Sequence, residues 1–258
     1  MTQQMPMVLP TNRVTALAAT SRLSQEAKMH SNFLFLGDSH IGYFQRAMQL
    51  AGFLGWQYQV CSVNGATAVG LRNPQAPVNA LATFRRFLQD KNRQSTVVLH
   101  LGETDCSFLF WYRAKKFNEP VIDQMRVSVA AYIGFVHELR RSGFIDVVIT
   151  GATPPTTRDD HDWGNDYRQD VTASLEERTK ATLDYNKSLL FHTRELGLRY
   201  LDINTDILDP TTRVVRPDCL NPDPTDHHLD YHLAGALWAE RICQMVASEP
   251  RRRRLSAA

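Results

Sequence analysis

Four short stretches of the sequence combine residue types that can perform chemistry. They are residues 37–40 (Gly-Asp-Ser-His), 64–65 (Asn-Gly), 102–105 (Gly-Glu-Thr-Asp) and 225–230 (Thr-Asp-His-His-Leu-Asp). Nucleophilic acyl transfer requires a serine near a histidine that takes its proton, a carboxylate that orients the histidine, and N–H donors for an oxyanion. The four stretches contain all of these groups, so they predict such a reaction if the fold brings them together.

The elements that would position these stretches follow from hydrophobic patterning and turn residues. Strands are expected at 32–36, 56–60, 96–101, 145–150 and 198–203, and helices at about 41–51, 78–90, 122–141, 175–196 and 231–246. Strands and helices alternate, which calls for crossover connections and a parallel sheet covered on both faces. The predicted fold is therefore a three-layer α/β/α sandwich with a five-stranded parallel sheet.

In such folds the functional crevice lies beyond the carboxyl ends of the strands. The first three stretches each follow an expected strand, and the fourth precedes the last helix. All four can therefore meet at one edge of the sheet. Ser39 is expected at the start of a helix, where unpaired backbone N–H groups and the helix dipole favour developing negative charge.

Length and composition predict one globular domain. The chain has 258 residues, of which 43% are hydrophobic, and a formal net charge of +2. We expect an N-terminal arm at 1–30, the domain at 31–247 and a basic, solvated tail at 248–258. This near-neutral charge predicts no binding to nucleic acid. No signal-like apolar region or run of about 20 apolar residues occurs, which predicts a cytoplasmic protein without membrane contact.

The order of the motifs resembles the SGNH hydrolase family, also called GDSL-type esterases, over about residues 31–246. The resemblance rests on Gly-Asp-Ser after the first strand, the glycine of Val-Asn-Gly-Ala-Thr, Gly-x-x-Asp after the third strand, and acid with histidine before the last helix. It implies a flavodoxin-like fold and hydrolysis of an acyl ester without a cofactor or metal. Ser39 would be the nucleophile, and the N–H groups of Ser39 and Gly65 would belong to the oxyanion hole.

The third block departs from the family pattern. Where the family has Gly-x-Asn-Asp, this chain has threonine at the asparagine position, so a hydroxyl of Thr104 replaces an amide donor. Loss of one such donor typically costs about 10²- to 10³-fold in rate. Asp105 is expected to be a structural support. Some SGNH-like proteins carry a similar Gly-Glu-x-Asp-Cys block, several of them beside bacterial glycan-modifying enzymes, which implies an acetylated sugar as a candidate ligand or substrate.

The last block departs too, because no acid stands three residues before any of its histidines. His228 is the expected base, since Leu229 follows it as in the family's His-Leu and Asp230 then suits the N-cap of the last helix. Asp226 is the nearest acid that could orient His228. His227 and Asp223 remain the alternatives.

Other interpretations of single residues stay open at this stage. The four cysteines have no C-x-x-C spacing and are expected to be reduced thiols. His100 suits a core imidazole, and His232 a surface position. The aromatic cluster at 107–113 would either pack beneath a long loop or form an apolar wall for the substrate. The polar insertion at 156–170 would be a lid or a surface loop.

The predicted function is hydrolysis of an acyl ester, with O-acetyl esters among the candidates, in a small molecule or carbohydrate. Ser39 attacks, His228 transfers the proton, Asp226 orients His228, and Ser39, Gly65 and Thr104 hold the oxyanion. Two alternatives are a non-catalytic or weakly active binding protein and a two-metal phosphoesterase. The ligands of the latter would be Asp38, His40, Glu103, Asp105, Asp226, His227 and His228. The oligomeric state is not predicted.

Overall fold

The computed structural model describes residues 32–159 and 171–248. The expected N-terminal arm, residues 160–170 of the polar insertion and residues 249–258 of the basic tail lie outside the described residues. The core is one parallel sheet with strand order β2-β1-β3-β4-β5. The strands are β1 (Asn32–Gly37), β2 (Gln57–Ser62), β3 (Thr96–His100), β4 (Val147–Thr150) and β5 (Arg199–Leu201).

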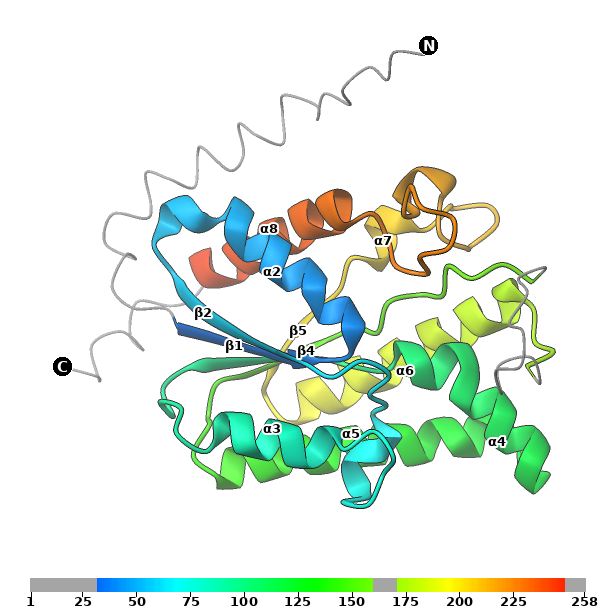
Figure 1. Ribbon diagram of the computed structural model, residues 1–258, viewed down its shortest axis with the longest axis horizontal. Coiled ribbons are helices and arrows are strands. Elements are labelled where there is room, and N and C mark those ends of the chain that lie inside the picture. Colours follow the sequence, from blue (N-terminus) through cyan, green and yellow to red (C-terminus); the bar gives the residue numbers. More distant parts are fainter. Residues whose placement is uncertain (1–31, 160–170, 249–258) are drawn as a thin grey trace, which may run out of the picture.

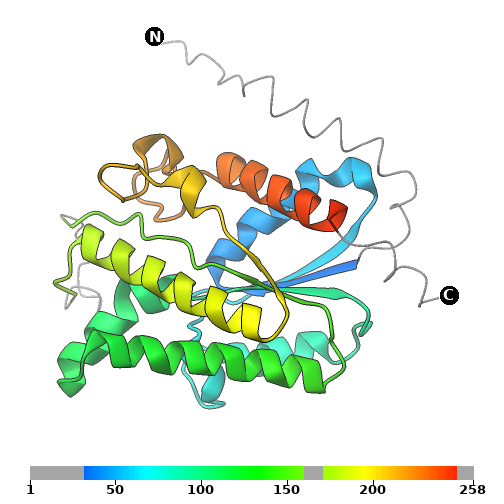
Figure 2. The ribbon, with the colours of Figure 1, turned by 180° about the vertical axis from the view of Figure 1, so that it is seen from behind.

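Helices cover both faces of this sheet, so the predicted three-layer α/β/α sandwich with a flavodoxin-like strand order is confirmed (Figure 1). One layer contains α2 (Gly42–Leu50) and α8 (Tyr231–Ala247), and the short α7 (Asn204–Ile207) lies beside them. The opposite layer contains α3 (Ala80–Leu88), α4 (Phe110–Phe117), α5 (Val121–Arg141) and α6 (Leu175–Glu195), and Figure 2 shows α5 and α6 side by side across it.

The central strand β1 shows how the sequence builds both layers. Successive side chains of a strand point to opposite faces. Phe33 and Phe35 accordingly pack into the core under α2 and α8, in the same cluster as Trp238, whereas Leu34 and Leu36 pack into the core under α3 and α5. All are buried, and burial of each such side chain contributes about 1.5–3 kcal/mol. Strands covered on both faces are continuous apolar runs for this reason.

The register of the strands brings three loops together at one edge of the sheet. Gly37, the last residue of β1, lies opposite Ser62 of β2 and His100 of β3. A Cβ atom at Gly37 would overlap the carbonyl oxygen of His100, so this close approach of two backbones requires glycine. The strand order reverses between β1 and β3, and a crevice is expected at such a reversal point.

Most expected elements are present, but the connection after β3 differs from the prediction. We expected residues 107–113 either to pack in the core beneath a long loop or to form an apolar wall for the substrate, and the long loop is wrong. Residues Asp105–Leu109 form a π-helical turn, η4, that continues into α4. Phe108 and Phe110 are buried, so core packing accounts for them. The aromatic run obscured the helical period, because aromatic residues are equally typical of strands.

Three further observations concern the strand ends, the cysteines and the character of the helices. Strands β4 and β5 are shorter than expected, since pairing covers only Val147–Thr150 and Arg199–Leu201. The four cysteines are free and buried. Among the described residues, no helix combines the length and the apolar character that crossing a membrane requires.

Candidate active site

Ser39 lies directly after β1, at the edge where the three loops meet. The helix expected to begin there starts as one 3₁₀ turn, η1 (Ser39–Ile41), and becomes α-helical at Gly42. Asp38 is the N-cap of this turn, because its Oδ1 accepts a hydrogen bond from the backbone N–H of His40 at 2.9 Å. Capping satisfies one N–H at the start of the turn and leaves the Ser39 side chain partly exposed.

Ser39, His228 and Asp226 form one hydrogen-bonded chain of side chains. The Oγ of Ser39 lies 2.9 Å from Nε2 of His228, and Nδ1 of His228 lies 2.5 Å from Oδ1 of Asp226. Partial burial raises the pKa of Asp226, but hydrogen bonds from the backbone N–H and ring of His228 outweigh it, so that pKa lies below its ordinary value. A charged carboxylate at Asp226 can only accept hydrogen bonds, so Nδ1 of His228 must carry a proton and donate it to that bond. Nε2 of His228 is then unprotonated and accepts a hydrogen bond from the hydroxyl of Ser39.

The loop that carries His228 is held from three sides. The backbone N–H of Leu229 donates to the hydroxyl oxygen of Tyr43 on α2 at 2.7 Å. The hydroxyl of Thr156, after β4, donates to the carbonyl oxygen of His227. Asn221 donates to Oδ2 of Asp226 at 3.0 Å. These contacts fix the position of the imidazole relative to Ser39.

The two alternatives from the sequence occupy other positions. The carboxylate of Asp223 accepts from the backbone N–H and the hydroxyl of Thr225 and has no contact with an imidazole among the described residues. The ring of His227 packs beside His228, with 4.3 Å between centroids, and it is His228 that meets Ser39. Asp230 caps α8 through the N–H of Leu233, and His232 is exposed and contacts Arg46.

The backbone N–H groups of Ser39 and Gly65 have no acceptor within residues 32–159 and 171–248. Gly65 has φ +70°, a left-handed conformation that favours glycine. Its turn is anchored to the serine loop, because the N–H of Val63 donates to the carbonyl oxygen of Gly37 at 3.0 Å. Thr104 is partly buried at the start of η4, and its hydroxyl has no hydrogen-bond partner in the described part of the chain.

Asp105 ties the second loop to the third. Its buried carboxylate accepts hydrogen bonds from the N–H groups of Ala68 and Val69 at 2.7 and 3.1 Å, and from the hydroxyl of Ser128 at 2.8 Å. Burial raises the pKa of Asp105 to about 6, and the three donors limit this rise. The carboxylate therefore supports the chain that follows Gly65 and does not point toward the chain of Ser39, His228 and Asp226.

A buried polar layer lies behind the serine. Nδ1 of His40 lies 3.1 Å from Oδ1 of Asp38, and the ring of His40 packs against that of His228 with 4.5 Å between centroids. Both ring nitrogens of His100 have hydrogen-bond partners, the hydroxyls of Thr150 and Thr153. Burial lowers the pKa of His40 to about 3 and that of His100 to about 4, so both imidazoles are neutral near pH 7.

The ligand set imagined for a two-metal phosphoesterase is not assembled. Asp105 binds backbone N–H groups, Glu103 accepts from Ser107 at 2.5 Å, and Asp38 binds His40. Within the described residues, the potential metal ligands that converge are three imidazoles, with no carboxylate among them. Two metal ions bridged by carboxylates would need a different arrangement.

Sequence reasoning missed Tyr43 and Thr156. Tyr43 occupies a buried helix position, where an aromatic side chain usually signals core packing, and no local pattern marks its hydroxyl as a hydrogen-bond acceptor. Thr156 lies 71 residues from His227, the residue whose carbonyl it contacts. Only the folded structure brings these partners together.

The fold is shared with solved structures of GDSL-type acylhydrolases. Solved structures with this fold include a protein from Bacteroides fragilis described as a putative acylhydrolase, which is 14% identical with a TM-score of 0.57 over 88% of this chain and 94% of its own. A GDSL-like lipase from Bacteroides thetaiotaomicron is 13% identical, with a TM-score of 0.54 over 91% of this chain and 97% of its own. A carbohydrate acetylesterase family member from Sinorhizobium meliloti is 14% identical, with a TM-score of 0.54 over 85% and 100%.

No protein-family model and no curated protein sequence matches this chain. At 13–14% identity, the likeness to these structures establishes the shared fold. What the chain does must be argued from its own site.

Proposed function

We propose that this chain is a serine hydrolase that cleaves a carboxylic ester. The observation that carries the proposal is the hydrogen-bonded chain from Ser39 Oγ through His228 to Asp226, with distances of 2.9 and 2.5 Å. A serine hydroxyl is a weak nucleophile unless an adjacent base takes its proton. Here a neutral imidazole nitrogen faces the hydroxyl and a carboxylate holds the imidazole in that tautomer.

The reaction follows from these positions. Ser39 Oγ forms a bond to the ester carbonyl carbon while its proton passes to Nε2 of His228. The tetrahedral intermediate collapses, the bond to the alcohol oxygen breaks, and His228 returns the proton to the departing alcohol. Water then attacks the acyl carbon while His228 takes a proton from it. The bond between Ser39 Oγ and the acyl carbon breaks, His228 returns the proton to Oγ, and the carboxylic acid leaves. Asp226 stabilises the imidazolium in each step.

The oxyanion would be held by the N–H groups of Ser39 and Gly65, aided by the hydroxyl of Thr104. The absence of acceptors for the two N–H groups in the described residues supports this assignment. Donors preorganised toward developing charge supply much of the barrier reduction in acyl transfer. Asp105 maintains this arrangement by holding the N–H groups of Ala68 and Val69.

The substrate class we propose is an O-acyl ester, with an O-acetylated small molecule or carbohydrate the first choice. The acetyl xylan esterase with the same fold, which is 14% identical with a TM-score of 0.52, and the carbohydrate acetylesterase family member support this choice. The proposed reaction requires no cofactor. Location in the cytoplasm and a domain at 31–247 remain predictions from the sequence.

The decisive experiment is labelling by a fluorophosphonate probe, with the parent compared with Ser39→Ala. The probe forms an Oγ–P bond and releases fluoride only where a serine is activated by a base. We expect saturable labelling of the parent and none of Ser39→Ala. Equal labelling of both, or none in either, argues against the mechanism; hydrolysis of p-nitrophenyl acetate by the same two proteins provides a second readout.

A non-catalytic or weakly active binding protein is the second candidate, and Thr104 in place of asparagine is the observation that favours it. Loss of one oxyanion donor costs about 10²- to 10³-fold. This candidate predicts binding of acetylated sugars by calorimetry without their deacetylation, together with slow labelling of Ser39.

A further inference from the structure

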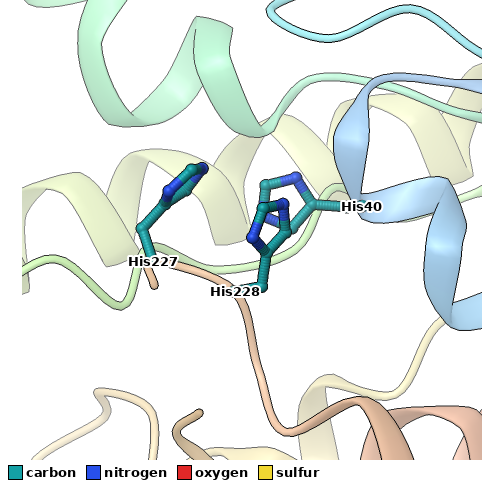
Figure 3. Close-up of side chains that lie close together, drawn as sticks. All are labelled: His40, His227 and His228. Carbon is teal, nitrogen blue, oxygen red and sulfur yellow. The ribbon is translucent and has the colours of Figure 1, made fainter. Parts of the chain in front are cut away.

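Three imidazoles lie close together (Figure 3), and one of them, that of His228, contacts Ser39. His40 comes from η1, and His227 and His228 come from the loop before α8, so segments nearly 190 residues apart supply the cluster. One ring nitrogen of each lies within 4.8 Å of the others. His40 and His228 are buried, and His227 is partly exposed. Ester hydrolysis uses only His228, so the other two imidazoles require an explanation.

The two buried imidazoles are prepared as metal ligands would be. Nδ1 of His40 meets Asp38 at 3.1 Å and Nδ1 of His228 meets Asp226 at 2.5 Å, which leaves Nε2 of each for another partner. Histidines that bind metals nearly always donate their other ring N–H to a carboxylate or carbonyl. Asp38 also has a buried Oδ2 without a hydrogen-bond partner in the described residues, and a dication at His40 would supply an opposing charge.

The three imidazole ligands favour a transition metal ion over Mg²⁺ or Ca²⁺. Three imidazole nitrogens without an inward carboxylate suit Zn²⁺, whereas Mg²⁺ and Ca²⁺ require oxygen ligands. Zn–N bonds of about 2.0–2.1 Å place two nitrogens of a tetrahedral site about 3.4 Å apart. The ring nitrogens, which now lie up to 4.8 Å apart, must therefore approach one another by up to about 1.4 Å, and rotation of the partly exposed His227 ring would contribute to this.

We propose that His40, His227 and His228 form a zinc site that switches off the serine. Zn²⁺ bound to Nε2 of His228 occupies the lone pair that accepts the Ser39 proton, and Ser39 Oγ, 2.9 Å from that nitrogen, lies where the fourth ligand would be. The zinc site itself stands on the imidazole geometry. Its inhibitory effect rests on the proposed serine hydrolase function.

Calorimetric titration of the whole chain with Zn²⁺ tests the site directly. We expect one ion per chain for the parent. His227→Ala should bind at least about tenfold more weakly, since loss of even an outer-shell partner typically costs 10- to 100-fold. His232→Ala is the matched control, because His232 is an exposed histidine outside the cluster. Tetrahedral Co²⁺ would add a visible absorption band that His227→Ala lacks.

The inhibitory effect is read from the fluorophosphonate labelling rate of each variant in Zn²⁺ divided by its own rate in EDTA. For the parent and for His232→Ala, we expect zinc to lower this ratio at least about tenfold. At the same zinc concentration, the ratio for His227→Ala should stay near one, because that variant binds zinc more weakly. Equal zinc affinity of parent and His227→Ala, or no saturable binding, overturns the site. Zinc binding through His227 without slower labelling overturns inhibition. Absence of labelling in EDTA defeats the hydrolase proposal, while calorimetry still decides the zinc site.

Discussion

The hydroxyl oxygen of Tyr43 lies 2.7 Å from the backbone nitrogen of Leu229, the residue that follows His228. Tyr43 belongs to α2, the helix that continues from the serine turn, so this bond joins the two segments that carry the proposed nucleophile and base. Burial raises the pKa of Tyr43 above its ordinary value, so the neutral phenol accepts the N–H over the whole working pH range. Tyr43 is therefore a positioning residue for His228.

Replacing Tyr43 by Phe removes the acceptor of the Leu229 N–H and keeps the ring. We expect the fluorophosphonate labelling rate to fall about tenfold, which corresponds to about 1.4 kcal/mol. The free energy of unfolding should fall by about 1–3 kcal/mol, because a buried N–H loses its partner. The measurements are labelling kinetics and urea denaturation.

Tyr132→Phe is the matched control for Tyr43→Phe. Tyr132 is also fully buried, and its hydroxyl donates to the carbonyl oxygen of Leu99 in β3, away from the His228 loop. The two variants should lose similar stability, and only Tyr43→Phe should label slowly. Equal labelling of the two variants would contradict a positioning role for Tyr43.

The second prediction separates the two candidate acids. Asp226→Asn places an amide opposite Nδ1 of His228, and the amide N–H₂ favours the tautomer in which Nε2 carries the proton and cannot accept one from Ser39. We expect the turnover rate for p-nitrophenyl acetate to fall about 10³- to 10⁴-fold. Asp223→Asn, three residues away, should change it less than about twofold, since within the described residues the Asp223 carboxylate accepts hydrogen bonds only from Thr225. A larger effect of Asp223→Asn would reverse the assignment.

The fold and the order of the site loops were predictable because they depend on local signals. The apolar run at 32–36 and Gly37 predict a buried strand followed by a tight turn, and the alternation of strands and helices predicts the parallel sheet. The carboxyl ends of parallel strands lie at the same edge of a sheet, so the loops that carry Ser39, Gly65 and Thr104 are expected at that edge. Asp226 was chosen only because it is the acid nearest to His228 in the sequence. His228 was chosen because Leu229 follows it, as in the family's His-Leu motif, and because Asp230 then suits the N-cap of the last helix.

Contacts between distant segments were not predictable. The hydrogen bonds of Tyr43 and Thr156 to the His228 loop join residues 186 and 71 positions apart, and no local pattern encodes such pairs. The helical path through η4 and α4 was missed because its aromatic residues are typical of strands as well as helices. The convergence of His40 with His227 and His228 likewise depends on how η1 packs against the loop before α8.

The third prediction concerns stability at acid pH. Burial lowers the pKa of His100 to about 4, below its unfolded value near 6.5, although Asp38 opposes this shift. Between these two values the unfolded chain binds more protons, so His100 contributes stability above pH 6.5 that is lost as the pH falls. From pH 7 to pH 5 this single group costs about 2 kcal/mol.

The variant His100→Gln removes the titrating group at this buried position. Its free energy of unfolding should therefore fall about 2 kcal/mol less than that of the parent between pH 7 and pH 5, whatever its stability at pH 7. Urea denaturation at the two pH values, in EDTA, measures the difference. Parallel losses in parent and His100→Gln would show that His100 is not neutral in the folded protein.

The last prediction tests Thr104 as the third oxyanion donor. Its hydroxyl has no partner in the described residues and follows β3, where the GDSL-type pattern carries an asparagine. Thr104→Val preserves shape and removes the donor, so we expect turnover to fall about 10- to 100-fold with little change in KM, because an oxyanion donor acts mainly in the transition state. Thr104→Ser should retain activity within a few-fold, and Thr104→Asn should equal or exceed the parent. If Thr104→Val turns over substrate as fast as Thr104→Ser, the hydroxyl takes no part, and the N–H groups of Ser39 and Gly65 hold the oxyanion alone.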